Sequence, residues 1–155
     1  MAAPPTTVHA SAVLVGARAV LIRGPSGAGK SRLALALIAA AEAGALPFAR
    51  LVSDDRSRLA AQHGRLLVRP TAELAGLIEV RGLGIRRLPF EPVAVVGLVV
   101  DLAAADGARL PAGTSHRVML EGIEVARLAV ASGIDPLPLV LARRMSNDPA
   151  APAEV

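Results

Sequence analysis

One eight-residue segment has the composition of a loop that binds nucleotide phosphates. It fits the pattern G-x-x-x-x-G-K-[ST], in which backbone N–H groups cradle phosphate oxygens and glycines let the chain curve around them. Its lysine, Lys30, is the only lysine among the 17 Lys and Arg residues of the chain, and a compact ammonium on a flexible stem can reach between β- and γ-phosphates. The hydroxyl of Ser31 is a ligand type that magnesium accepts. The eight residues are Gly24, Pro25, Ser26, Gly27, Ala28, Gly29, Lys30 and Ser31.

A pair of carboxylates, Asp54 and Asp55, follows a short apolar run that predicts a strand. Beside a phosphate loop, one strand-end carboxylate can hold magnesium and the other can take a proton from an attacking hydroxyl. The pair could equally begin a turn, in which Asp54 hydrogen-bonds to the backbone ahead of it. Asp101, at the end of the apolar run 93–100, is the rival magnesium ligand, because it stands where an ordinary P-loop nucleotidase carries an aspartate.

A third group is formed by Glu79 and Arg81, which stand two residues apart in an expected strand. At that spacing both side chains project from the same face. Glu79 would then hold magnesium while Arg81 contacts phosphoryl oxygens, although a surface ion pair fits the same spacing. His9 precedes the first expected strand, and taken alone it is most simply a solvated side chain.

The elements around these groups are predicted from apolar periodicity. Two strands over 12–15 and 19–23 lead into the loop, and a helix over 31–43 follows it, which is the context that a phosphate loop requires. Further strands are expected over 50–53, 58–61, 65–68, 77–80, 93–102, 117–120 and 123–126, with a short helix over 71–75 and a final helix over 136–145. We expect one domain over residues 1–145 and a disordered, Pro/Ala-rich C-terminal tail over 146–155.

The composition limits the classes of function. Of the 155 residues, 53% are hydrophobic, but Phe48 and Phe90 are the only aromatic ones, so the core must consist of small aliphatic side chains, as suits a parallel or mixed sheet covered by helices. The absence of cysteine excludes disulfides and thiolate metal sites. The net charge of +4 could indicate a nucleic-acid partner, but the arginines are scattered and aromatic stacking residues are nearly absent. We therefore expect a cytoplasmic protein that binds neither nucleic acid nor membranes.

Together these segments resemble the C-terminal catalytic domain of HPr kinase/phosphorylase, a bacterial enzyme of phosphotransferase-system regulation. The matching elements are His9, the loop 24–31, the segment 51–56 and the segment 77–85, and their order and spacing agree over about half of the chain. The Glu-x-Arg-Gly pattern that begins at Glu79 is specific to that family, whereas a phosphate loop alone is not. The resemblance implies an α/β fold of P-loop-containing type, with the arrangement of bacterial phosphoenolpyruvate carboxykinase and a mixed sheet flanked by helices.

The resemblance also implies an activity and the residues that perform it. The expected function is that of an ATP- and Mg²⁺-dependent protein serine kinase acting on HPr or a nitrogen-branch relative, within a homo-oligomer that is a hexamer in relatives. Asp55 would be the base, and in reverse the acid, and Ser31 and Glu79 would bind magnesium. Asp54 is the further magnesium candidate from the carboxylate pair described above. Lys30 would bind phosphate.

Two further residues take their expected roles from the resemblance alone. His9 matches a histidine near the active site, and Arg81 lies in the signature loop that both activities of the family need. The chain also departs from the family pattern. There is no room before His9 for the family's N-terminal domain, which indicates a short form, and the segment 124–128 lacks the Pro-Gly-Arg pattern associated with phosphorolytic dephosphorylation. The alternatives are an ATP-binding regulatory sensor without catalysis and a small-metabolite P-loop kinase that uses Asp101.

Overall fold

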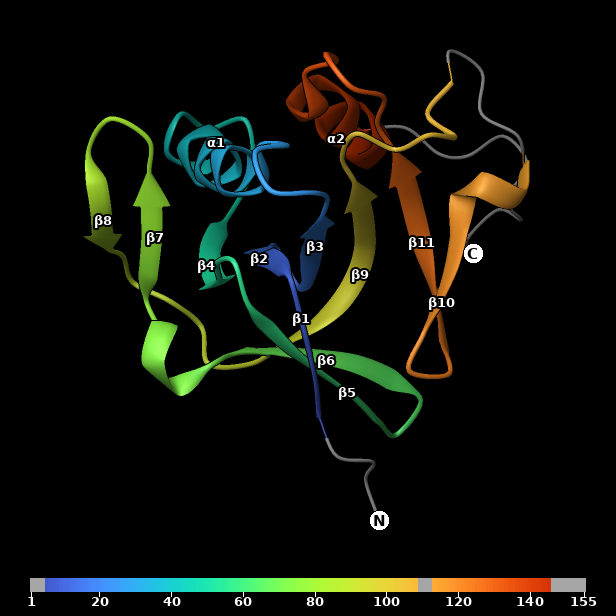
Figure 1. Cartoon of the computed structure of the whole chain (residues 1–155), viewed down its shortest axis with the longest axis horizontal. Coiled ribbons are helices and arrows are strands. Elements are labelled where there is room, and N and C mark those ends of the chain that lie inside the picture. Colours follow the sequence, from blue (N-terminus) through green and yellow to red (C-terminus); the bar gives the residue numbers. More distant parts are fainter. Residues whose placement is uncertain (1–4, 109–112, 146–155) are drawn as a thin grey trace.

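The structure, a computed structural model, describes residues 5–108 and 113–145. A curled, mixed β-sheet carries two α-helices on one face (Figure 1). In chain order the elements are β1 (Thr6–Val8), β2 (Ala10–Val15), β3 (Arg18–Arg23), α1 (Lys30–Glu42), β4 (Ala49–Ser53), β5 (Ser57–Gln62), β6 (Arg65–Pro70), the 3₁₀ turn η1 (Ala72–Leu74), β7 (Leu77–Val80), β8 (Gly84–Arg87), β9 (Ala94–Asp101), η2 (Gly113–His116), β10 (Arg117–Leu120), β11 (Ile123–Ala129) and α2 (Pro136–Met145). The expected α/β class with a mixed sheet is confirmed, while the expected tail 146–155 lies outside the described residues.

The order of the strands brings the predicted site to one edge of the sheet. The main path runs β1-β5-β6-β9-β3-β2-β4, with β11 paired to β9 and β10 paired to β11. Because β3, β9 and β11 are parallel, their carboxyl ends meet at the same edge, from which the loop 24–29 leads into α1. The β7–β8 hairpin forms a separate two-stranded sheet beside this edge (Figure 1).

A bulge in β9 lets this strand belong to two layers. Its first half pairs with β6 and its second half with β11, while β3 follows it on the other side. The pairing with β3 shifts by one residue at Gly97, so Val96 and Leu98, two positions apart, enter different cores. Gly97 is required there because a Cβ at this position would lie 2.7 Å from the Cβ of Arg18.

The two faces of the sheet are covered in different ways. On the upper face, α1 and α2 pack over strands through a core that includes Leu33, Leu37 and Val140. On the lower face, β5, β6 and β10 fold back under the sheet around residues such as Leu59 and Val68. The composition predicts a sheet flanked by helices, but both helices lie on one face, because the curl of the sheet lets its own outer strands cover the other.

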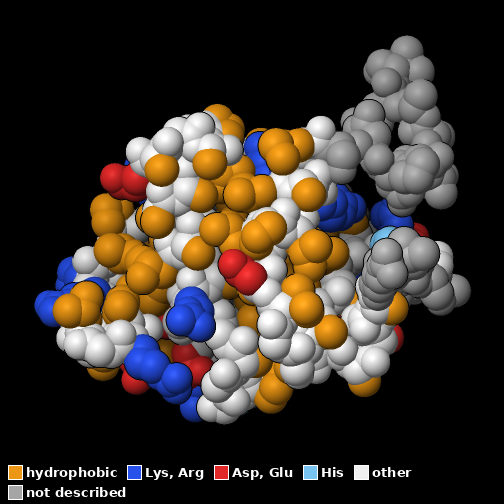
Figure 2. All heavy atoms as spheres, turned by 90° about the horizontal axis from the view of Figure 1, so that it is seen from above, with side chains coloured by type: hydrophobic (Ala, Val, Ile, Leu, Met, Phe, Trp, Pro, Cys, Tyr) orange, Lys and Arg blue, Asp and Glu red, His pale blue; other side chains and the backbone are white. Residues whose placement is uncertain are grey.

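Seen from the helix side, hydrophobic side chains are spread over much of the surface, and acidic and basic groups are scattered among them (Figure 2). Within the described ranges, no helix is long and apolar enough to cross a membrane. Two strands, β1 and β8, were not expected from the sequence, and the short helix expected over 71–75 is the 3₁₀ turn η1.

Candidate active site at the loop edge of the sheet

The loop 24–29 turns sharply between β3 and α1. Gly29 immediately precedes the helix with a φ of 102°, in the left-handed region that favours glycine. Gly24 lies close to the chain that follows β9, since a Cβ at this position would be 3.1 Å from the Cβ of Leu102 and 3.2 Å from that of Ala28. Because α1 begins at Lys30, its first N–H groups have no carbonyl partner within the helix and carry the positive end of the helix dipole.

The side chain of Lys30 bends back across this loop. Its Nζ donates to the carbonyl oxygen of Gly24 at 2.8 Å and to that of Pro25 at 3.2 Å. The Ala28 N–H donates to the Pro25 carbonyl at 3.0 Å, so the loop is closed on itself. The ammonium is therefore held against two carbonyl oxygens at the start of the loop.

The carboxylate of Asp54 joins three elements. It is only 5% exposed, and its Oδ1 accepts hydrogen bonds from Ser31 Oγ at 2.7 Å and from Ser11 Oγ at 2.6 Å. Its Oδ2 accepts the backbone N–H of Glu79 at 3.2 Å. Asp54 thus ties the first turn of α1, strand β2 and the end of β7 together, and it places its own oxygen beside the hydroxyl of Ser31.

Asp55, in contrast, is exposed and sits at the centre of a tight turn. The N–H of Arg56 donates to the carbonyl of Asp54 at 2.7 Å, and Asp55 has a φ of 65°, which together describe a γ-turn of the strained, positive-φ kind. Strained backbone of this type is concentrated at functional sites. The Asp55 N–H donates to Ser11 Oγ at 3.3 Å, so one buried hydroxyl contacts both the carboxylate of Asp54 and the backbone of Asp55.

Two more buried serines, at the end of β4 and at the start of β5, join the strands that flank this turn. Ser57 Oγ donates to the carbonyl of Ala10 at 2.8 Å and lies 2.6 Å from Ser53 Oγ. Since a hydroxyl has one hydrogen to give, Ser53 is the donor between the two serines. Sequence reasoning missed the role of Ser11. The available signal was a polar residue in phase with Val13 on the face that β2 turns toward α1.

The remaining predicted residues lie at the same edge but with fewer contacts. Glu79 is exposed on β7 and is joined to the site through its backbone N–H. Arg81 lies beyond the end of β7, because the chain turns at Gly82 (φ 92°) and Leu83 N–H donates to the Val80 carbonyl at 2.9 Å. The expectation that Glu79 and Arg81 share a strand face is therefore wrong, and no ion pair joins them in the described chain.

His9 is exposed at the bend between β1 and β2. The next residue, Ala10, pairs with Arg23 and accepts the hydrogen bond from Ser57. This position places His9 at the edge of the sheet where the loop begins.

Asp101 serves a different purpose from Asp54. Arg23 binds both of its oxygens at 2.7 Å, and Arg127 Nε donates to its Oδ2 at 2.6 Å while the same guanidinium binds both oxygens of Asp106. Burial raises the pKa of Asp101, but the hydrogen bonds and charges of Arg23 and Arg127 outweigh it, so the pKa lies below its usual value. Arg23, Asp101 and Arg127 together hold the carboxyl ends of β3, β9 and β11 side by side, directly before the loop. Both carboxylate oxygens of Asp101 are bound by these arginines.

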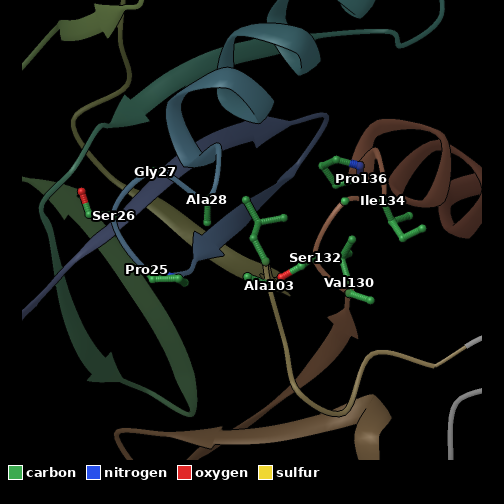
Figure 3. A pocket seen from close by; sticks show the side chains of 12 residues that line it. Pro25, Ser26, Gly27, Ala28, Ala103, Val130, Ser132, Ile134 and Pro136 are labelled. Carbon is green, nitrogen blue, oxygen red and sulfur yellow. The ribbon is translucent and has the colours of Figure 1, made fainter.

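A cavity of about 350 Å³ opens beside the loop (Figure 3). Residues 25–28 form one wall, and the chain segments that follow β9 and β11 form the others. Ser26 and Ser132 supply the only hydroxyls of a lining that is otherwise aliphatic or glycine. The cavity suits an uncharged organic group attached to a phosphate chain that lies on the loop.

The sequence profile described as HPr Serine kinase C-terminal domain matches residues 1–89. The chain belongs to the HPr serine kinase C-terminal domain family. The match contains the predicted site residues from His9 to Arg81, whereas the far walls of the cavity, Asp101 and Arg127 lie beyond it.

Individual relatives agree with the family membership. HPr kinase/phosphorylase of Clostridium beijerinckii is 41% identical over 83 residues, and that of Halalkalibacterium halodurans is 42% identical over 84; each alignment covers 54% of this chain. The chain spans about a quarter (25%) of the length of these relatives. The structure of the Hpr(Ser) kinase/phosphatase from Coxiella burnetii matches with a TM-score of 0.71 and 27% identity, over 90% of this chain and 95% of that one. The fold of this HPr kinase family member therefore extends well past residue 89.

Proposed function

We propose that this protein is an ATP- and magnesium-dependent protein serine kinase that phosphorylates HPr or an HPr-like phosphocarrier. One observation carries the proposal: a buried Asp54 hydrogen-bonded to the loop serine Ser31 stands next to an exposed Asp55 held in a strained turn. The family membership supports the choice of a seryl acceptor over a small metabolite. ATP and phosphocarriers are both cytoplasmic, so the proposal places the protein in the cytoplasm.

In this proposal the loop 24–31 is a P-loop of the phosphoenolpyruvate-carboxykinase type. The amides of the loop and the first turn of α1 bind the phosphates of ATP, and the aliphatic cavity takes the nucleoside. Lys30 exchanges the carbonyls of Gly24 and Pro25 for β- and γ-phosphate oxygens, because a phosphate is the stronger partner for an ammonium.

The donor set at the loop edge fits magnesium. Ser31 Oγ and Asp54 Oδ1 are hard oxygen atoms that share one hydrogen bond of 2.7 Å, and Glu79 adds a carboxylate at the neighbouring strand end. In the described chain no three His, Cys, Asp or Glu side chains gather into a metal cage, which agrees with a cation bound by few protein ligands and by substrate phosphates. When bound, the cation would neutralise charge on the transferring phosphoryl group.

Asp55 acts as the general base. A seryl hydroxyl of the acceptor forms a bond to the γ-phosphorus, its proton passes to the Asp55 carboxylate, and the bond to the β-phosphate oxygen breaks with ADP leaving. Lys30 and the loop amides hold the phosphate oxygens in line during the transfer. His9 and Arg81, at the same edge, would contact the acceptor or the phosphoryl oxygens.

The test is incubation of the purified protein with radiolabelled ATP, magnesium and an HPr phosphocarrier, followed by phosphoamino-acid analysis. We expect phosphoserine with the wild type and none with Lys30→Ala. ATP binding without phosphoserine would leave an ATP-binding sensor as the function. A small-metabolite kinase that uses Asp101 is disfavoured, because two arginines neutralise the charge of that carboxylate, whereas Asp54 accepts only from uncharged hydroxyl and amide groups.

A further inference from the structure

Two arginines lie directly opposite each other on neighbouring antiparallel strands. Arg58 of β5 pairs with Arg69 of β6, and Thr7 of β1 pairs with Arg58 on its other side. The adjacent pair Leu59 and Val68 is buried in the lower core. Since side chains alternate along a strand, Arg58 and Arg69 project from the outer face of this layer.

This arrangement is unfavourable for the isolated chain. Like charges directly opposite each other in a sheet destabilise it. Across the described strand pairs this is the one position where two charges of the same sign face each other. Neither guanidinium has a carboxylate within ion-pair distance in residues 5–108 and 113–145, whereas Arg23, for example, is paired with Asp101.

Arg58 and Arg69 lie close to Asp55, the proposed general base. Arg58 lies three positions after Asp55, which limits the distance between their Cα atoms to about 11 Å even for an extended chain. Ser57, between them, is bonded to Ser53 and to the Ala10 carbonyl, so the start of β5 is held against β4 and β2. A protein that docks on another covers about 800 Å² of it, roughly a disc of 16 Å radius. A protein acceptor that brings a hydroxyl to Asp55 therefore has room to cover Arg58.

We propose that Arg58 and Arg69 form a docking surface for carboxylates of the acceptor protein, so that the acceptor presents acidic side chains beside its reacting serine. The position of that serine rests on the proposed function. Two adjacent guanidinium groups bind carboxylates in bidentate geometry, and such a contact relieves their mutual repulsion. Ion pairs at the surface of a complex mainly raise the association rate and fix the orientation of the partner, and their contribution falls as the salt concentration rises.

The first experiment measures carboxylate binding without catalysis. Fluorescein-labelled poly-L-glutamate is titrated with the protein, and its anisotropy is followed at low and at physiological salt. The double variant Arg58→Gln/Arg69→Gln should bind about tenfold more weakly at low salt, because it loses two ion pairs made by half-exposed side chains. Arg58→Lys/Arg69→Lys should retain most of the binding. The charge-matched control Arg117→Gln/Arg143→Gln, on exposed positions in β10 and in the last turn of α2, should bind nearly as the wild type does.

An equal loss in the control variant, or no loss in Arg58→Gln/Arg69→Gln, overturns the proposal. Thermal unfolding shows whether the variant is still folded. Because the repulsion between the two arginines is removed, the Tm of Arg58→Gln/Arg69→Gln should equal or exceed that of the wild type.

The second experiment separates this inference from the kinase assignment. With HPr as acceptor, Arg58→Gln/Arg69→Gln should raise the KM for HPr about tenfold and leave the KM for ATP unchanged. An unchanged KM for HPr overturns the docking proposal while the kinase stands. If no variant forms phosphoserine, the proposed function fails, and the poly-L-glutamate titration alone decides whether this surface binds carboxylates.

Discussion

Ser11→Ala should lower the rate of phosphoryl transfer through a residue that cannot itself react. The Ser11 hydroxyl donates to the Asp54 carboxylate at 2.6 Å and accepts from the Asp55 N–H at 3.3 Å. Alanine removes both bonds and leaves the other two contacts of Asp54, from Ser31 and the Glu79 N–H, in place. The turn that presents Asp55 then loses the hydrogen bond that its own N–H donates to β2.

The size of the effect follows from these contacts. A hydrogen bond to a charged group contributes about 1.5–3 kcal/mol, and the Asp55 N–H lies near solvent, so we expect a loss of about 2 kcal/mol in the free energy of unfolding. In a domain of this size that is a fall of about 4–8 °C in Tm. A displacement of the base by about 1 Å costs up to about 10²-fold in rate, so kcat should fall about 10–100-fold with little change in the KM for ATP.

Ser57→Ala is the matched control. Ser57 is as fully buried as Ser11 and also takes part in two hydrogen bonds, to the Ala10 carbonyl and with Ser53, so its loss should lower Tm by a similar amount. Neither bond reaches Asp54 or Asp55. The assay compares Tm by calorimetry with kcat and KM from phosphoserine formation. Equal kcat in the two variants would show that Ser11 contributes only stability, and the positioning argument would fail.

Four other predictions follow from the site. Asp55→Asn should cut transfer by about 10²–10⁴ with ATP affinity and Tm nearly unchanged, whereas Asp54→Asn should lower Tm as well; the reverse pattern in calorimetry and kinetics would exchange their roles. Lys30→Ala should abolish ATP binding in equilibrium titrations, and normal turnover would remove the loop from the mechanism. The pKa of Asp101 is depressed, so its ion pairs stabilise the fold above the ordinary value of 3.8 and lose that contribution as pH falls through the folded-state pKa; Asp101→Asn should flatten this part of the Tm–pH curve. Phosphate added to phosphorylated HPr should release little pyrophosphate, and brisk release measured by a coupled assay would contradict the inference from segment 124–128.

The parts of the fold that depend on local signals could be predicted from the sequence. Apolar runs bounded by glycine identified most strands, and the loop pattern placed the start of α1 within one residue, because each of these depends on neighbours along the chain. The juxtaposition of the loop with Asp54 also followed, since both stand at strand ends.

Features that arise from pairing between distant segments could not be predicted in this way. The shift at Gly97, which moves β9 from one layer to the other, is set by β3 and β6 and leaves no local pattern. Ser11 gains its role only because β4 ends beside β2. Arg81 was misplaced because a four-residue strand and a turn have no periodicity long enough to separate them. Tertiary contacts decide such positions.

The geometry of Lys30 has a practical consequence. With one lysine in the chain, the loop 24–31 holds the only side-chain amine, which donates to a backbone carbonyl at 2.8 Å. An amine-directed reagent modifies that residue and the chain's α-amino group, which mass spectrometry separates by peptide. If added nucleotide lowers the rate at which Lys30 is modified, that change measures binding of nucleotide at the loop. Labelling with ¹⁵N-lysine gives a single side-chain ammonium resonance, which reports on the loop alone.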